Sequence, residues 1–213
     1  MHEELVSRSI ELPGGALRLC QLRESAELPD DGPVEWAPMT PYWSVMWRSG
    51  VALARATDTS ALAGLRVLEL GCGMALPSMA AARAGALTLA TDESEEALEL
   101  VERNARLNGV ELETALVDWA TPGELFDRGP FDLVVAADVL YEPRAVPVLA
   151  GLLARLVGPG GEVWLADPGR PREPEFLRLV DAAGWRRETT VATPPDAVPR
   201  VRIHRLVRDT PAG

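Results

Sequence analysis

The feature that most constrains this chain is a regular alternation of short apolar runs and helix-like segments from residue 66 onwards. Apolar runs of strand length stand at 66–70, 86–91, 112–117, 131–137 and 162–166. Segments with helical signals stand between or after them, at 76–84, 94–108, 146–157 and 174–183. Val191 and the stretch 201–207 predict a final pair of strands. Strands that alternate with helices pair in parallel, so we expect an α/β fold with helices on both faces of the sheet.

Residues 1–62 follow a different pattern and predict an extension that packs on a core formed by residues 63–213. Two strands, 5–12 and 16–22, flank a Pro-Gly-Gly turn. Apolar spacing then predicts a Trp-rich amphipathic helix over 43–56, interrupted by Gly50. An acidic loop over 23–41 separates the two and carries Glu24, Glu27, Asp30, Asp31 and Glu35. This loop is either a solvated surface or an attractor for a basic segment of a partner.

Composition excludes several classes of protein. All 21 basic residues are Arg, which excludes enzymes that need a lysine amine nucleophile or the lysine of a P-loop. G+C-rich codon usage is a sufficient cause of this bias. The two cysteines and two histidines support no disulfide framework, no metal site and no histidine-dependent triad. A net charge of −11 argues against nucleic-acid partners, and no signal peptide or membrane-spanning run is found, so a cytoplasmic protein is expected.

A glycine-containing turn follows the first strand of the alternating region. It reads Glu69-Leu-Gly71-Cys72-Gly73, and such glycines let the backbone approach a ligand closely before a helix begins. The full dinucleotide fingerprint is incomplete, because Leu76 stands where its third glycine would be. Asp92 lies 19 residues after Gly73, at the tip of the second strand, where a carboxylate can accept bonds from two ribose hydroxyls. The pair indicates an adenosine ligand without naming the cofactor.

Two further acidic residues follow later strands. Asp118-Trp119 comes after the third strand, where a carboxylate can bind the adenine amino group and the indole either flanks the ring or packs in the core. Asp138 and Tyr141 follow the strand 131–137 and lie over the crevice where open α/β sheets bind ligands. There they can hold an amine by charge and aromatic contact, although Asp138 can also be an ordinary helix N-cap.

These motifs together resemble the class I, seven-strand S-adenosylmethionine-dependent methyltransferases, and among them the protein lysine methyltransferases with an Asp-x-x-Tyr motif. The resemblance rests on Pro41 to Trp47, the glycine turn, Asp92, Asp118-Trp119 and Asp138-x-x-Tyr141. The segment 167–171 (Asp-Pro-Gly-Arg-Pro) resembles the electron transfer flavoprotein beta-subunit lysine methyltransferases and their bacterial relatives. The implied fold is a Rossmann-like, seven-stranded, mostly parallel sheet with helices on both faces and a short N-terminal β/helix extension.

The resemblance also implies a role for each residue of the site. The cofactor S-adenosyl-L-methionine, with S-adenosyl-L-homocysteine as product, would be bound by Trp47, Glu69, Gly71, Cys72, Gly73, Asp92, Asp118, Trp119 and the backbone near Ala137. Asp138 would orient the acceptor nitrogen and Tyr141 would wall the methylation pocket. Ala75 replaces a glycine that many members carry at this position.

Three residues are candidates for substrate binding. Trp43 is expected on one helix face with Trp47, where it either contacts substrate or seals the core. Arg170 and Arg172 stand in a Pro-punctuated loop beyond a strand end. That loop either selects substrate or is a rigid surface connection.

We expect an N-methyltransferase that acts on a lysine side chain of a partner protein, for example the electron transfer flavoprotein beta subunit. The alternatives are a small-molecule amine N-methyltransferase and a non-catalytic cofactor-binding interaction module on the same fold. A nicotinamide oxidoreductase is a third alternative, which the incomplete glycine fingerprint disfavours. The sequence indicates neither the substrate nor the number of methyl groups nor the oligomeric state.

Overall fold

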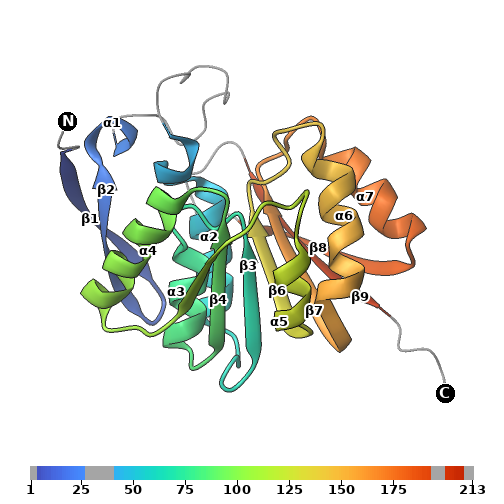
Figure 1. Cartoon of the computed structure of the whole chain (residues 1–213), viewed down its shortest axis with the longest axis horizontal. Helices are drawn as coiled ribbons and strands as arrows, with labels where there is room; N and C mark the ends of the chain where they lie inside the picture. The colour runs from blue at the N-terminus through green and yellow to red at the C-terminus, as the bar shows by residue number, and fades with distance from the viewer. Residues whose placement is uncertain (1–3, 27–40, 193–199, 209–213) are drawn as a thin grey trace.

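The computed structural model describes residues 4–26, 41–192 and 200–208 of the chain. Figure 1 shows a central sheet with helices on both sides and a separate two-stranded hairpin beside it. The sheet has seven strands in the order β5-β4-β3-β6-β7-β9-β8. They are β3 (Arg66–Leu70), β4 (Leu87–Asp92), β5 (Glu113–Leu116), β6 (Phe131–Ala137), β7 (Val157–Asp167), β8 (Trp185–Ala192) and β9 (Val201–Arg208).

The strand directions confirm the predicted fold class. Strands β5, β4, β3, β6 and β7 pair in parallel, and β9 is antiparallel to both β7 and β8. The chain builds outward from β3 to β5 and then crosses back to place β6 on the other side of β3. This reversal is a topological switch point, and open α/β sheets bind ligands outside the carboxyl ends of the strands at such a point.

Helices cover both faces of the sheet, because side chains alternate between the faces along each strand. In β6, Leu133 and Val135 pack into the cluster that includes α2 and α3, whereas Val134 and Ala136 pack into the cluster built with α6 and α7. The helices are α2 (Arg48–Asp58), α3 (Leu76–Arg83), α4 (Glu95–Asn108), α5 (Gly123–Arg128), α6 (Ala145–Leu156) and α7 (Glu173–Ala182). The sequence pattern missed α5, which is only six residues long.

Helix α4 begins after Ser94 and ends at Gly109, as its capping residues predicted. The Ser94 hydroxyl accepts a hydrogen bond from the Ala97 N–H at 3.2 Å. Gly109 ends the helix in the left-handed conformation, at a φ of 64°. An N-cap serine and a left-handed glycine satisfy backbone groups that a helix end leaves unpaired.

The N-terminal hairpin of β1 (Leu5–Leu12) and β2 (Gly15–Leu22) confirms the first predicted strands. Its apolar side chains Leu17 and Leu19 are buried against the cluster that includes α3. Two side-chain amides of α4 bind the outer edge of β2. Asn104 pairs with the backbone N–H and C=O of Cys20, and Asn108 pairs with those of Arg18.

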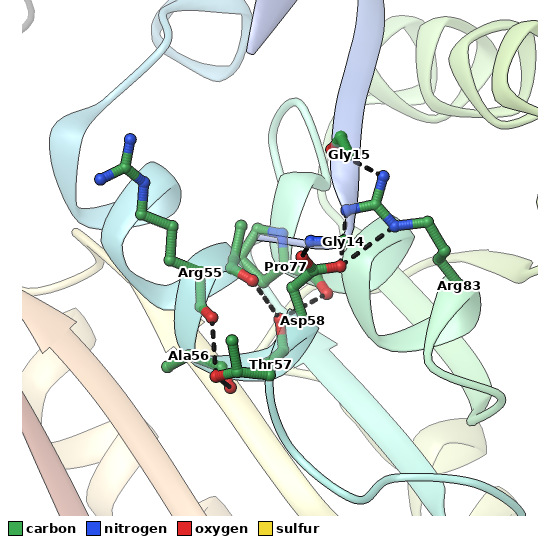
Figure 2. A network of polar contacts seen from close by, with 10 residues as sticks. Gly14, Gly15, Arg55, Ala56, Thr57, Asp58, Pro77 and Arg83 are labelled. Carbon is green, nitrogen blue, oxygen red and sulfur yellow. Dashed lines mark hydrogen bonds and ion pairs between the residues drawn. The ribbon is translucent and has the colours of Figure 1, made fainter. Parts of the chain in front are cut away.

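Figure 2 shows how the hairpin turn is tied to the core through Asp58 at the end of α2. The Asp58 carboxylate accepts from the Gly14 N–H and forms an ion pair with Arg83 of α3, which also donates to the Gly15 carbonyl at 2.9 Å. A Cβ on Gly14 would lie 2.9 Å from an Asp58 oxygen, so a larger residue here would displace the Asp58 carboxylate. The hairpin is therefore held at its turn and along one edge.

The predicted helix over 43–56 is wrong in its first part. Tyr42–Ser44 form a 3-10 turn (η2), Val45 is extended, and α2 begins only at Arg48 with Trp47 as an extended N-cap residue. Trp43 and Trp47 therefore do not share a helix face. The physical reason is that β-branched and aromatic residues are weak helix formers, and the Trp47 indole N–H instead donates to the Tyr42 carbonyl at 3.1 Å. Gly50, expected to interrupt the helix, lies inside α2.

Other boundaries differ by smaller amounts. Strand β7 is longer than predicted and begins at Val157, directly after α6. Of the predicted acidic loop, Glu24 lies in a short helix, α1 (Arg23–Ala26), while Glu27, Asp30, Asp31 and Glu35 lie outside the described residues. In the described part of the chain, no helix is both long and apolar enough to cross a membrane. The division into 1–62 and 63–213 stays a prediction.

Candidate functional site

A cleft of about 510 Å³ opens at the carboxyl ends of β3, β4, β5 and β6, against η2 and the start of α2. Its volume lies within the range of about 300–1,000 Å³ that is usual for small-molecule sites. Its lining includes twelve of the residues singled out from the sequence: Trp43, Trp47, Glu69, Gly71, Cys72, Gly73, Asp92, Asp118, Trp119, Ala137, Asp138 and Tyr141. Arg170 and Arg172 are outside this lining. The fold thus gathers residues from five separate segments of the chain.

The glycine turn between β3 and α3 places backbone at the floor of this cleft. Gly71 and Gly73 have φ angles of 63° and 48°, values that favour glycine. A Cβ on Gly73 would come within 2.8 Å of the Trp43 carbonyl oxygen, so η2 can approach only because this side chain is absent. Ala75 also adopts a left-handed conformation, with a φ of 51°. This conformation costs a residue with a Cβ about 1–2 kcal/mol.

Glu69 faces the start of α3 from within β3. It is almost fully buried and accepts hydrogen bonds from the Ser78 N–H at 2.9 Å and from the Ser78 hydroxyl. Burial raises the pKa of Glu69 to about 8, with a smaller contribution from the nearby Asp92 carboxylate. Both hydrogen bonds come from one serine in the first turn of α3. The Glu69 carboxyl therefore fixes the start of this helix and also lines the cleft.

Cys72 contributes backbone rather than reactive sulfur. Its N–H donates to the Thr91 carbonyl at 2.8 Å, which joins the glycine turn to the end of β4. Burial, with the charges of Asp92 and Glu69, raises the pKa of the Cys72 thiol well above its usual range. The sulfur is therefore a neutral thiol near pH 7 and a poor nucleophile.

Asp92 ends β4 with its carboxylate held by backbone groups. One oxygen accepts from the Gly73 N–H at 2.8 Å and the other accepts from the Ser94 N–H at 3.1 Å. Burial raises the pKa of Asp92, and these hydrogen bonds oppose that shift. An ionised carboxylate offers about four acceptor positions, so a position on each oxygen remains for a ligand.

Asp118 and Trp119 form the wall beyond β5. An Asp118 oxygen accepts from the Ala120 N–H at 2.8 Å, which fixes the turn, and the side chain is exposed at the cleft. Trp119 is half-buried and lies against Gly71, where an added Cβ would be 3.3 Å from the indole. Trp119 therefore both packs on the core and borders the cleft, so the two interpretations of this residue are compatible.

Two tyrosine rings also line the cleft. The rings of Tyr42 and Tyr141 have centroids 6.2 Å apart and are tilted by 59°. Tyr141 keeps 40% of its surface exposed, yet burial and the surrounding carboxylates raise its pKa to about 12. It is a neutral phenol at any physiological pH. Tyr42 was not singled out from the sequence, although it stands in the Pro41 to Trp47 segment that did carry a signal.

Asp138 occupies the carboxyl end of β6 in a left-handed conformation, with a φ of 58°, and its N–H donates to the Ala166 carbonyl at 2.9 Å. It is not a helix N-cap, because α6 begins at Ala145. Its carboxylate binds the Arg170 guanidinium through two bonds, at 2.6 and 3.1 Å. Burial raises the pKa of Asp138, and the bonds and charge of Arg170 oppose that shift.

The two arginines of the loop after β7 have different surroundings. Arg170 is largely buried, with its guanidinium on Asp138 and 5.5 Å from the centre of the Trp47 ring. Arg172 is exposed and lies 3.5 Å from Glu175 in the first turn of α7. The structure thus brings Arg170 to the site through Asp138, while substrate binding by Arg172 stays a prediction. No sequence signal linked Arg170 to a residue 32 positions away.

The fold is that of the Rossmann-like methyltransferases. The structure is similar to a magnesium protoporphyrin IX methyltransferase from Synechocystis PCC 6803 with bound SAM, with a TM-score of 0.60 and 23% identity over 75% of this chain and 81% of that one. It is also similar to the T. Thermophilus 16S rRNA N2 G1207 methyltransferase, with a TM-score of 0.68 and 14% identity over 96% of this chain and 51% of that one.

Within that class, residues 42–182 match the model of the lysine methyltransferase family, and the chain belongs to this family. It is 32% identical over 143 residues to the electron transfer flavoprotein beta subunit lysine methyltransferase of Xenopus laevis, which covers 65% of this chain and 56% of that protein. It is 34% identical over 122 residues to the ubiquinone biosynthesis O-methyltransferase of Rhizobium leguminosarum bv. trifolii, which covers 57% of this chain and 47% of that protein. The chain thus spans about half the length of these relatives.

Proposed function

We propose that this protein is an S-adenosylmethionine-dependent N-methyltransferase that transfers methyl groups to a lysine side chain of a partner protein in the cytoplasm. The observation that carries the proposal is that Asp138 and Tyr141 stand in the same cleft as the glycine turn and Asp92. A site for an adenosine-containing cofactor and a site for an amine are then adjacent. Family membership supports the same assignment.

The residues present fit the cofactor. Asp92 is fixed by two backbone donors and retains acceptor positions for two ribose hydroxyls. Asp118 offers a carboxylate for the adenine amino group, and the Gly71 to Gly73 backbone leaves room for the methionine part. Trp47 and Trp119 supply the flat apolar surfaces that a ring and a sulfonium require.

The reaction needs alignment and a neutral amine. The acceptor nitrogen's lone pair forms the new N–C bond while the C–S bond of the sulfonium breaks and its electron pair stays on sulfur. A lysine amine must first release a proton to water, because its ordinary pKa is about 10.4. In this proposal Asp138 accepts a hydrogen bond from the amine and aims its lone pair, Tyr141 walls the pocket as a neutral phenol, and the apolar walls disfavour the charged ammonium.

A partner protein is favoured over nucleic acid as the substrate. The net charge of −11 disfavours contact with phosphates and favours a basic, lysine-bearing surface. The relatives from Xenopus laevis and Rattus norvegicus, at 32% and 33% identity, are electron transfer flavoprotein beta subunit lysine methyltransferases. We therefore take that subunit as the first candidate substrate.

A small-molecule methyltransferase is the second candidate function. It is favoured by the similarity to bacterial ubiquinone biosynthesis O-methyltransferases, at 34% identity. The two functions share the cofactor site and differ in what reaches the acceptor end of the cleft.

The test is to incubate the protein with methyl-labelled S-adenosylmethionine and either electron transfer flavoprotein beta subunit or a bacterial lysate, then to locate the label by peptide mass spectrometry. We expect label on lysines of proteins. Since the chain contains no lysine, every lysine label belongs to a partner. Label confined to the low-molecular-mass filtrate would instead support the second candidate.

Two variants give the test its controls. Asp138→Asn keeps the shape of the side chain and is expected to abolish the lysine label. Asp132→Ala changes a carboxylate at the opposite end of the same strand, where it accepts from the Arg66 N–H at 2.8 Å, and should leave the label unchanged. Equal label from wild type and Asp138→Asn would contradict the assignment of Asp138.

A further inference from the structure

We propose that Arg170 is a positioning residue of the acceptor site. Its guanidinium keeps the Asp138 carboxylate ionised, fixes its orientation and balances its negative charge, so that the acceptor nitrogen binds beside it as a neutral amine. The inference rests on the proposed function and deepens it. It assigns a task to a residue that lies beyond the cleft and makes Asp138 half of a buried ion pair rather than a free carboxylate.

The contact is a bidentate ion pair. Arg170 Nε lies 2.6 Å from Asp138 Oδ1, and Arg170 Nη2 lies 3.1 Å from Asp138 Oδ2. The side chains are 14% and 3% exposed, so water screens the pair poorly. A guanidinium fork fixes the plane of a carboxylate as well as its charge, which a single ammonium cannot do. Each oxygen keeps a further acceptor position for an amine in the cleft.

The loop that carries Arg170 is itself fixed by Asp167 at the end of β7. One Asp167 oxygen accepts from the N–H groups of both Gly169 and Arg170, each at 2.7 Å. Gly169 turns the chain at a φ of 94°. The guanidinium also lies 5.5 Å from the centre of the Trp47 ring. Arg170 is therefore held at its backbone and along its side chain, which is the arrangement of a fixed group rather than one that swings away.

The position of Arg170 also argues against its standing where the acceptor would bind. Asp138, Trp47 and Tyr141 line the cleft, whereas Arg170 does not. Asp138 thus borders the cleft and is also bound by Arg170, which comes from the loop after β7. The acceptor and Arg170 can then contact Asp138 at the same time.

Several other charges face this pair from the surrounding elements. Asp167 at the end of β7 has its pKa raised to about 6, mainly by burial, and its second oxygen has no partner among the described residues. Glu173 of α7 is neutralised by Arg202 of β9. Tyr141 is neutral, and Asp92 of β4 lines the same cleft. Glu93, Glu142 and Arg144 also line the cleft, and Arg144 pairs with Glu142. Arg170 forms the ion pair with Asp138 itself, so its removal takes away the direct partner of that carboxylate.

The expected consequence concerns the proton on the acceptor. An unpaired buried carboxylate stabilises an ammonium beside it, and this raises the pKa of the amine and lowers the fraction that can accept a methyl group. A carboxylate already paired with arginine still accepts a hydrogen bond but stabilises the ammonium less. Arg170 thus favours the protonation state that the transfer needs.

The first measurement needs no turnover. Carbon-detected NMR follows the side-chain carboxyl of Asp138 through a pH titration, with Asp138→Asn used to assign its signal. We expect the pKa of Asp138 to rise by at least about one unit in Arg170→Gln, since a neighbouring arginine lowers a carboxyl pKa by about 1–3 units. An unchanged titration in a folded Arg170→Gln variant would overturn the proposal. Arg128→Gln, which removes an exposed partner of Glu113, is the matched control and should leave the Asp138 signal unchanged.

The second measurement uses lysine labelling of the flavoprotein subunit or lysate proteins as a function of pH. Arg170→Gln should lower kcat/KM at pH 7 about tenfold and move the acidic limb of the profile up by about one pH unit, with S-adenosylmethionine affinity retained. Arg170→Lys keeps the charge without the fork and should fall between Arg170→Gln and wild type. An unshifted profile in Arg170→Gln would overturn the proposal. If the wild type labels no lysine, the proposed function fails, while the NMR titration still decides whether Arg170 controls Asp138.

The Arg170→Lys variant provides a third result, because it introduces the chain's only lysine. Its intact mass after incubation with S-adenosylmethionine is expected to stay unchanged, since residue 170 is outside the lining of the cleft. A gain of one or more methyl groups at this residue would show that residue 170 reaches the acceptor position, and would overturn the proposal.

Discussion

Asp92 and Asp138 occupy equivalent places, at the carboxyl ends of the parallel strands β4 and β6, yet they are held in different ways. The Asp92 carboxylate is bound by the backbone N–H groups of Gly73 and Ser94. The Asp138 carboxylate is bound by the side chain of Arg170. Backbone donors carry no net charge, so they do not offset the charge that Asp92 would offer to ribose hydroxyls in the proposed function. Arg170 balances the charge of Asp138, which would suit the uncharged nitrogen that the proposed function requires.

The largest loss of activity is expected when the charge of Asp138 is removed. Asp138→Asn keeps the shape of the side chain and removes its charge. We expect lysine labelling to fall about a hundredfold or more, because the acceptor is no longer aligned, while S-adenosylmethionine affinity measured by calorimetry is unchanged. A parallel loss of affinity would place Asp138 in cofactor binding or folding instead.

Removing the charge of Asp92 should instead weaken cofactor binding and leave the labelling rate at saturating cofactor nearly unchanged. Asp92→Asn weakens the hydrogen bonds that the ribose hydroxyls would donate to a charged acceptor, each worth about 1.5–3 kcal/mol, so S-adenosylmethionine affinity should fall about tenfold to a hundredfold. At saturating cofactor the labelling rate should approach that of wild type. An unchanged dissociation constant would refute the role of Asp92, and Asp132→Asn on β6 is the control for a carboxylate outside the cleft.

The glycine turn that supplies one backbone donor to Asp92 also allows η2 to approach, and this approach can be tested at Gly73. A Cβ at this position meets the Trp43 carbonyl at 2.8 Å and the φ of 48° adds strain, so Gly73→Ala should destabilise the fold by about 2 kcal/mol or more. Gly64→Ala is the matched control, because Gly64 has a φ of 76° but open space around a Cβ. Equal melting temperatures for the two variants would show that η2 does not depend on the approach to Gly73.

The smallest effect concerns Glu69, a third carboxyl near this edge of the sheet. Its pKa is about 8 in the folded protein and 4.5 when unperturbed, so the folded state binds the proton more tightly and loses stability as pH rises between these values. Glu69→Gln does not titrate, and its stability relative to wild type should increase by about 1.4 kcal/mol per pH unit between pH 6 and 7. Chemical denaturation of the cofactor-free proteins at the two pH values measures this, and a constant difference would mean that Glu69 is ionised throughout.

The same comparison shows what the sequence could predict. Asp92 was recognisable because its partners are local consequences of a glycine turn and of a serine N-cap, both of which have short sequence signatures. The strands and α4 were predicted for the same reason. The Arg170–Asp138 pair was not, since it depends on how β6 and β7 lie side by side. The aromatic segment 41–47 was recognised as a motif, but the helix predicted from residue 43 was wrong. Its aromatic residues Trp43 and Trp47 line the cleft instead of sharing a helix face.

The asparagine contacts of the N-terminal hairpin have a consequence for association between chains. An unpaired strand edge offers rows of N–H and C=O groups on which another strand can assemble. At Arg18 and Cys20 of β2 these groups are already bonded to Asn108 and Asn104 of α4. A helix thereby completes a strand edge through its side-chain amides, and this stretch of β2 is closed to edge-to-edge aggregation without any further strand.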